Sequence, residues 1–169
     1  AGIRGRMEIH ETRSVGTGMA FHGIWHHKRI LLVRSGVGRH LALQALENVC
    51  NHYVVSEILS IGFAGGLVSE LSLGDLVIAD TIREIKAGTG PEETGLLQVN
   101  RIGVERALKL RFPQALPRWQ GGLVTVDQPV CKPSEKIKLG KNSAAIAVDM
   151  ESSALLKAAL KRGIPFLSI

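Results

Sequence analysis

Short apolar segments alternate with amphipathic segments along most of the 169-residue chain. The apolar segments are rich in Val, Ile and Leu, which is typical of strands that are buried on both faces. The segments between them repeat their apolar residues every three or four positions, which predicts helices. The expected strands are residues 29–36, 55–63, 74–82, 119–127, 145–150 and 165–169, and the expected helices are residues 39–53, 100–112, 133–141 and 151–163.

This alternation predicts an α/β fold with a mixed, mostly parallel central sheet. The more polar, Gly-rich segment from Glu8 to Trp25 predicts a hairpin, and the adjacent histidines His26 and His27 are typical of a turn tip. Residues 86–95, which are rich in Gly, Pro, Glu and Thr, predict a surface loop. From its length we expect the chain to form a single domain, residues 1–169.

Composition limits the classes of function. The net charge is +6, but Lys and Arg are scattered without an aromatic-and-basic stripe, so we expect no nucleic-acid binding. Cys50 and Cys131 have neither metal nor redox spacing, and we expect free thiols in a cytoplasmic protein. No apolar run approaches the roughly 20 residues that cross a bilayer, so we expect no membrane span.

Gly or polar residues follow four of the expected strands, and ligands of α/β proteins bind at the carboxyl ends of strands. These segments are SGVG (residues 35–38), GFAGGL (62–67), DQ (127–128) and DMES (149–152). The Gly-rich segment 62–67 lets a ligand approach backbone N–H groups, although a tight turn explains it equally well. Asp127 could face a ligand or lie in a turn.

The segment AVDMES places two carboxylates where a strand passes into a helix. On an extended chain Asp149 and Glu151 would project to the same side, with Met150 opposite. A carboxylate can accept hydrogen bonds from both hydroxyls of a ribose. Asp149 or Ser152 could instead cap the helix, because acidic and hydroxyl side chains are favoured there. Taken alone, the segment favours the capping role.

Four blocks together resemble the superfamily of purine nucleoside phosphorylases and methylthioadenosine/S-adenosylhomocysteine nucleosidases. They are SGVGR, SIGFAGGLVSELSLGDLVIADTI, GLVTVDQPV and AIAVDMESSALLKAALKRGIPFLSI, and their order and spacing agree from about Gly16 to the end. The chain is most similar to nucleosidase-like members, which include the hopanoid-associated phosphorylase branch. The resemblance implies a three-layer α/β/α fold and cleavage of the bond between a purine and its ribose.

The resemblance also implies the chemistry. The reaction of the family passes through an oxocarbenium-like ribosyl centre, while a carboxylic acid protonates the leaving base and water or phosphate attacks the anomeric carbon. Glu151 matches the Glu that binds the ribose hydroxyls, and Met150 matches the Met that packs on the sugar. Gly65 and Val130 match backbone contacts to the ligand. Further possible site residues are Asp149, which stands where the family often has Glu, Asp127 and Ser35.

Three positions depart from the family; the first two favour water as the nucleophile, and the third argues against stacking of an aromatic residue on the base. Ser60 stands where hexameric phosphorylases carry a phosphate-binding Arg, Phe63 where the family has a Ser, and Pro129 where an aromatic residue commonly stacks on the base. The expected reaction is therefore hydrolysis of an adenosine-like, 5′-substituted nucleoside to free base. Phosphorolysis is the alternative, since Arg34 or Arg39 could bind phosphate, and an incomplete, non-catalytic nucleoside-binding domain is the second alternative.

The resemblance also leads to expectations about the two ends of the chain. We expect the chain to lack the first strand of the family, because Arg4 and Arg6 suit a buried strand poorly. We also expect it to lack the C-terminal segment that follows the strand PFLSI in the family. The catalytic residues are accordingly unknown, and the general acid is expected beyond Ile169. The expected partners are a small-molecule nucleoside and further copies of the chain in a homodimer or higher homo-oligomer. We expect no cofactor or metal, with phosphate as co-substrate only in a phosphorylase.

Overall fold

A computed structural model describes residues 2–85, 95–109 and 116–169. The predicted surface loop falls almost entirely outside the described residues, as do the last three residues of the helix predicted over 100–112. The chain divides into two compact units, residues 1–54 and 55–169. Each unit has its own strands, helices and buried side chains.

The first unit is a three-stranded antiparallel meander with one helix. The strands pair in chain order, which confirms the predicted hairpin and extends it by one strand. The helix contacts the first two strands and buries Ala42, Ala45, Leu46 and Val49. The elements of this unit are η1 (Ile3–Arg6), β1 (Glu8–Val15), β2 (Gly18–Trp25), β3 (Lys28–Arg34) and α1 (Arg39–His52).

A two-residue turn joins β2 to β3. Trp25 pairs with Lys28, so His26 and His27 form the tip, as the sequence predicted. Both histidines have left-handed backbones, with φ of 47° and 61°. Two positive φ values in succession define the type I′ turn, which fits the twist of a hairpin but favours Asn and Gly.

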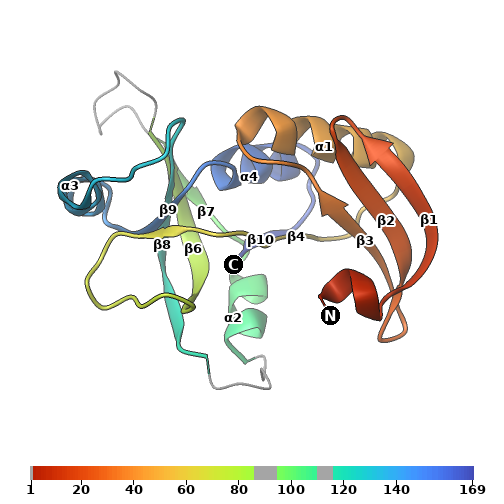
Figure 1. The fold of residues 1–169 in the computed structure, drawn as a ribbon, viewed down its shortest axis with the longest axis horizontal. Coiled ribbons are helices and arrows are strands. Elements are labelled where there is room, and N and C mark those ends of the chain that lie inside the picture. Colours follow the sequence, from red (N-terminus) through yellow and green to blue (C-terminus); the bar gives the residue numbers. More distant parts are fainter. Residues whose placement is uncertain (1, 86–94, 110–115) are drawn as a thin grey trace. The chain divides into compact units, whose positions relative to one another are not determined.

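The second unit contains a mixed five-stranded sheet in the order β5-β9-β8-β6-β7. Its three central strands are parallel and lie side by side (Figure 1), whereas the two edge strands are antiparallel to their neighbours. A separate parallel pair joins β10 to β4. The strands are β4 (Ile58–Ser60), β5 (Gly65–Gly66), β6 (Leu76–Glu84), β7 (Leu96–Gln98), β8 (Arg118–Thr125), β9 (Ala145–Asp149) and β10 (Phe166–Ser168).

Helices cover both faces of this sheet. Along β8, Leu123 packs into a cluster with residues of α2 (Arg101–Lys109) and α4 (Ser152–Lys161). The next residue, Val124, packs into a second cluster that includes Leu139 of α3 (Pro133–Ser143). Successive side chains of a strand point to opposite faces, so the helices form layers on either side. This arrangement confirms the predicted α/β/α fold.

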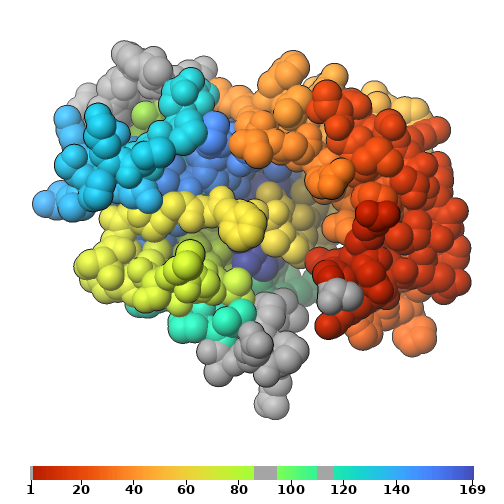
Figure 2. All heavy atoms as spheres, in the orientation of Figure 1, coloured from red at the N-terminus to blue at the C-terminus, as the bar shows by residue number. Residues whose placement is uncertain are grey.

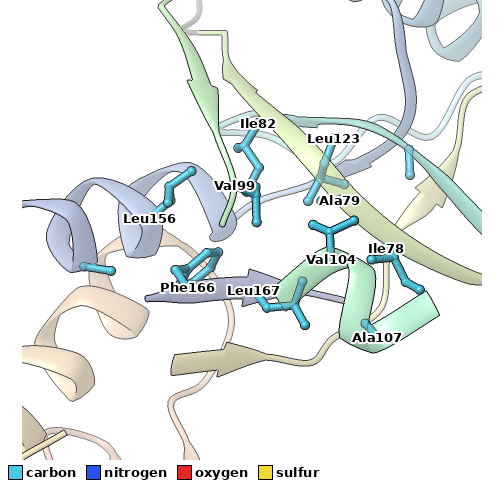
Figure 3. Close-up of a cluster of buried hydrophobic side chains, with 12 residues drawn as sticks. Ile78, Ala79, Ile82, Val99, Val104, Ala107, Leu123, Leu156, Phe166 and Leu167 are labelled. Carbon is cyan, nitrogen blue, oxygen red and sulfur yellow. The ribbon is translucent and has the colours of Figure 1, made fainter. Parts of the chain in front are cut away.

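The larger cluster is almost wholly aliphatic, in keeping with an aromatic content of 4%. Figure 3 shows Leu156, Phe166 and Leu167 converging on side chains of β6 and α2. Ile78 and Ile82 of β6 are at most 1% exposed. Each such side chain contributes about 1.5–3 kcal/mol when it is fully buried. This cluster therefore fixes α4 and β10 against the central strands.

Among the described helices, none combines the length and the apolar composition that crossing a bilayer requires.

Candidate functional site

Three parallel strands end in polar residues at the same edge of the sheet. Glu84 at the end of β6 is the register partner of Thr125 at the end of β8, and Thr125 is the partner of Asp149 at the end of β9. The sequence predicted a ligand site at such an edge. It also predicted that Asp149 would lie there, whereas the other two residues were not singled out.

The carboxylate of Asp149 is bound by groups of the protein itself. Thr125 Oγ1 donates to Asp149 Oδ1 over 2.6 Å, and the backbone N–H of Ser152 donates to Oδ2 over 2.8 Å. Ser152 is the first residue of α4 and Glu151 is its N-cap, so Asp149, two residues earlier, accepts one of the unpaired N–H groups at the start of the helix. This bond is of the helix-stabilising kind that the sequence offered as the alternative to a substrate contact.

Met150 and Glu151 form the turn between β9 and α4. Because β9 ends at Asp149, the alternation of an extended strand does not continue to Glu151, whose φ and ψ are −127° and −39°. The Met150 N–H donates to Glu151 Oε2 over 3.2 Å. The Glu151 carbonyl accepts the N–H groups of Ala154 and Leu155. Both Met150 and Glu151 are half-buried.

Gly65 pairs with β9 at Val148, one residue before Asp149, and Val130 packs against the cluster to which Val148 belongs. The pairing is antiparallel, and a Cβ at position 65 would lie 3.1 Å from Val148 Cγ1. Any larger residue would therefore press on the strand. Of the four predicted substrate-binding residues, Met150 and Glu151 directly follow the carboxyl end of β9 and Gly65 pairs with its penultimate residue, while Val130 packs against the same hydrophobic cluster as Val148.

The assignment of Asp127 and Ser35 to the site stays a prediction. Asp127 lies two residues past the end of β8 and is exposed. Ser35 belongs to the first unit, where its hydroxyl donates to the carbonyl of Gly36 over 3.1 Å.

Three residues depart from the family pattern: Ser60 at the end of β4, Phe63 in the segment that follows it, and Pro129 beyond the end of β8. The Ser60 carbonyl accepts the Ile169 N–H over 3.0 Å. The segment that follows β4 lies at the surface of its unit (yellow in Figure 2), and the side chain of Phe63 is fully exposed. Pro129 is also exposed. None of these three side chains carries a positive charge that would bind phosphate.

Sequence reasoning missed a group of buried hydroxyls beside Asp149. Thr125, Ser153 and Ser168 are at most 5% exposed, and Ser152 Oγ lies 2.9 Å from Ser168 Oγ. It also missed the ion pair between Glu84, which is 7% exposed, and Lys157 of α4. A Ser or Thr inside an apolar strand, as in the segments VTV and LSI, is the sequence signal that could have predicted these buried hydroxyls. In the part of the chain that the structure describes, no cluster of three or more His, Cys, Asp or Glu side chains could hold a metal ion.

Comparison with known proteins identifies the family. The family model described as the Phosphorylase superfamily matches residues 5–169. The chain belongs to this superfamily. The match includes the strand ends and the turn described above.

Curated relatives of this Phosphorylase superfamily member are nucleosidases. The 5′-methylthioadenosine/S-adenosylhomocysteine nucleosidase of Shewanella loihica is 26% identical over 153 residues, which are 84% of this chain and 66% of that protein. The aminodeoxyfutalosine nucleosidase of Helicobacter pylori is 25% identical over 158 residues, or 88% and 69%. The chain thus spans about two thirds of the length of both relatives.

Solved structures of the superfamily share the fold. A 5′-methylthioadenosine/S-adenosylhomocysteine nucleosidase from Colwellia psychrerythraea, in complex with adenine, has a TM-score of 0.84 at 20% identity. The similarity covers 98% of this chain and 74% of that one.

Proposed function

We propose that this chain belongs to a nucleosidase that cleaves the N-glycosidic bond of a purine nucleoside with water. The observation that carries the proposal is the turn at the carboxyl end of β9. This turn presents Glu151 beside Met150 at the start of α4, close to the Gly65 backbone. The superfamily match and the nucleosidase relatives support the same reaction.

In this proposal Glu151 accepts hydrogen bonds from the two ribose hydroxyls, and Met150 packs against the sugar. As the bond to the base breaks, positive charge develops on the ribosyl carbon, and a fixed carboxylate stabilises that charge. Water adds at the anomeric carbon and loses a proton, and the base leaves after it gains one. In the same proposal, the backbones of Gly65 and Val130 contact the ligand.

The substrate that we propose is an adenosine-like nucleoside with a 5′ substituent, because methylthioadenosine and S-adenosylhomocysteine appear in the name of the Shewanella loihica relative. Water is the proposed nucleophile, since positions 60 and 63 carry Ser and an exposed Phe rather than cationic side chains. We also propose that the active protein is a homodimer, for which analytical ultracentrifugation gives a direct measurement.

The decisive experiment incubates the protein with methylthioadenosine, adenosine or inosine, with and without phosphate, and follows the release of free base. We expect equal rates in both buffers, with free sugar as the second product. Release that requires phosphate and yields a sugar 1-phosphate would replace hydrolysis by phosphorolysis. Binding of nucleoside without any base release would leave a non-catalytic binding domain.

A Glu151→Gln variant tests the ribose contact. We expect kcat/KM to fall about 10- to 100-fold, because hydrogen bonds to a charged group contribute about 1.5–3 kcal/mol. The matched control is Glu105→Gln, which removes an exposed carboxylate on α2 that pairs with Arg101 of the same helix. Activity of Glu151→Gln equal to that of the control would remove Glu151 from the site.

A further inference from the structure

One buried hydroxyl holds both ends of the turn that carries Met150 and Glu151. Thr125 Oγ1 donates to Asp149 Oδ1 over 2.6 Å and accepts the Ser153 N–H over 3.0 Å. Asp149 is the residue before the turn, and Ser153 is the second residue of α4. The hydroxyl therefore joins β8 to the chain on either side of the turn.

This arrangement goes beyond what the start of a helix requires. The start of α4 needs only the bond from the Ser152 N–H to Asp149 Oδ2. Through Thr125, the turn is also bonded to β8. The Thr125 side chain is 0% exposed, so water does not compete for its hydrogen bonds. A buried hydrogen bond to a carboxylate is stronger than a neutral one and has a narrower geometry. The backbone from Asp149 to Ser153 is consequently fixed at three points.

The position of the Glu151 carboxylate depends on the position of this backbone. Its Oε2 accepts the Met150 N–H, and its carbonyl begins the hydrogen bonding of α4. Movement of residues 149–153 therefore moves the carboxylate as well. A displacement of about 1 Å can cost a reaction two orders of magnitude in rate.

We infer that Thr125 and Asp149 are positioning residues that set the ribose-binding carboxylate through the turn between them. We call the Thr125–Asp149–Ser153 set the hydroxyl clamp. The kinetic consequences of this inference rest on the proposed function, which assigns Glu151 to the ribose. The inference assigns Asp149 to the fold of the site rather than to contact with the substrate.

The test compares Thr125→Val, which has nearly the same shape without the hydroxyl, with Thr125→Ser, which keeps the hydroxyl. With methylthioadenosine as the probe, we expect Thr125→Val to raise KM about tenfold or more, since each tenfold change in affinity corresponds to about 1.4 kcal/mol. Thr125→Ser should restore KM to within about threefold of the wild type, because hydroxyl bonds survive. Partial unfolding alone would lower kcat and leave KM unchanged, so KM separates the two explanations.

The matched control is Ser143→Ala. Ser143 is also a buried hydroxyl, and it donates to the Leu139 carbonyl within α3 over 2.7 Å. We expect loss of the Ser143 hydroxyl to lower the free energy of unfolding without raising KM. A double-mutant cycle adds Asp149→Ala and the double variant with Thr125→Val. If the two residues act through one clamp, their effects on KM are less than additive.

Amide hydrogen exchange tests the clamp without any turnover. Thr125→Val should accelerate exchange at Ser153, which loses its acceptor, and also at Met150 inside the turn. If the wild type releases no base, the proposed function fails, and exchange still decides the inference. Wild-type KM in Thr125→Val, or acceleration confined to Ser153, would overturn the positioning role.

Discussion

At the scale of single residues, two carboxylates two positions apart have different surroundings. Asp149 and Glu151 have the same charge and nearly the same place in the sequence. The strand ends between them: Asp149 accepts hydrogen bonds from Thr125 and from the first residue of the helix, whereas Glu151 accepts one from the Met150 N–H in the adjacent turn. Local sequence offered Asp149 or Ser152 as a cap, and the structure shows Asp149 bonded to the first N–H of the helix, one residue beyond its N-cap Glu151. Local sequence could not predict Thr125, because that contact depends on the register of β8 against β9.

The single tyrosine of the chain gives a prediction at this scale. Tyr53 donates to Glu11 Oε2 over 3.0 Å. Burial, the hydrogen bond to Glu11 and the charge of Glu11 together raise the pKa of Tyr53, against a smaller opposite effect of Arg13. The phenolate absorbance of the folded protein should therefore appear with a midpoint above the usual value of about 10.

The same pKa shift links Tyr53 to stability. The folded chain holds the phenol proton more tightly than the unfolded chain does, so this contribution is full below the unfolded pKa and is lost as pH rises through the folded one. Glu11→Gln should lower the absorbance midpoint, whereas Glu47→Gln on α1 should leave it in place. A midpoint that is identical in all three proteins would disprove the Glu11 contact.

At the scale of elements, periodicity predicted the helices and most strands close to their observed bounds. The exception is the strand predicted over residues 55–63, of which only Ile58–Ser60 is extended. Ile58–Ser60 pair with β10, and the apolar residues Ile61 and Phe63 that follow are exposed. An apolar pattern shows which segment can form a strand, but the bounds of the strand depend on the pairing with its neighbour, which the local sequence does not specify.

The tip of the β2–β3 hairpin can be improved. Replacing His26 and His27 by Asn and Gly should raise the free energy of unfolding by about 1 kcal/mol, because these residues adopt left-handed backbones with less strain. Urea unfolding at an unchanged m-value measures the gain. His27→Val, with a β-branched side chain at the same φ of 61°, should shift the midpoint the other way. A hairpin indifferent to both changes would contradict the turn type.

The ion pair between Glu84 and Lys157 joins the end of β6 to α4. Lys157→Met should lower the free energy of unfolding by about 1–3 kcal/mol, because it leaves a buried carboxylate without its ammonium partner while the lysine itself is partly solvated. Glu84→Gln should cost less, since the amide oxygen still accepts a hydrogen bond. The exposed pair of Arg101 and Glu105 is the control, and Arg101→Ala should change stability by less than about 0.5 kcal/mol. Equal losses for Lys157→Met and Arg101→Ala would contradict a buried pair.

At the scale of the whole molecule, the alternation of strands and helices was sufficient to predict the α/β fold. The division at residues 54 and 55 was not visible, because no Gly- or Pro-rich linker marks it. The family depended on four blocks read together, since each strand end taken alone had an ordinary structural explanation. The assignment of Gly65, Val130, Met150 and Glu151 to a substrate stays a prediction until the variants are measured.

The hydroxyl clamp has a consequence for how such sequences diverge. Asp149 accepts the Ser152 N–H at the start of a helix, and Thr125 fills a buried position, so a copy of this protein that lost its activity would still be selected to keep them for stability alone. Most residues of the AVDMES segment would then be retained after the activity is lost. Under the proposed function, Glu151 is the residue of this segment whose loss would indicate a change of function.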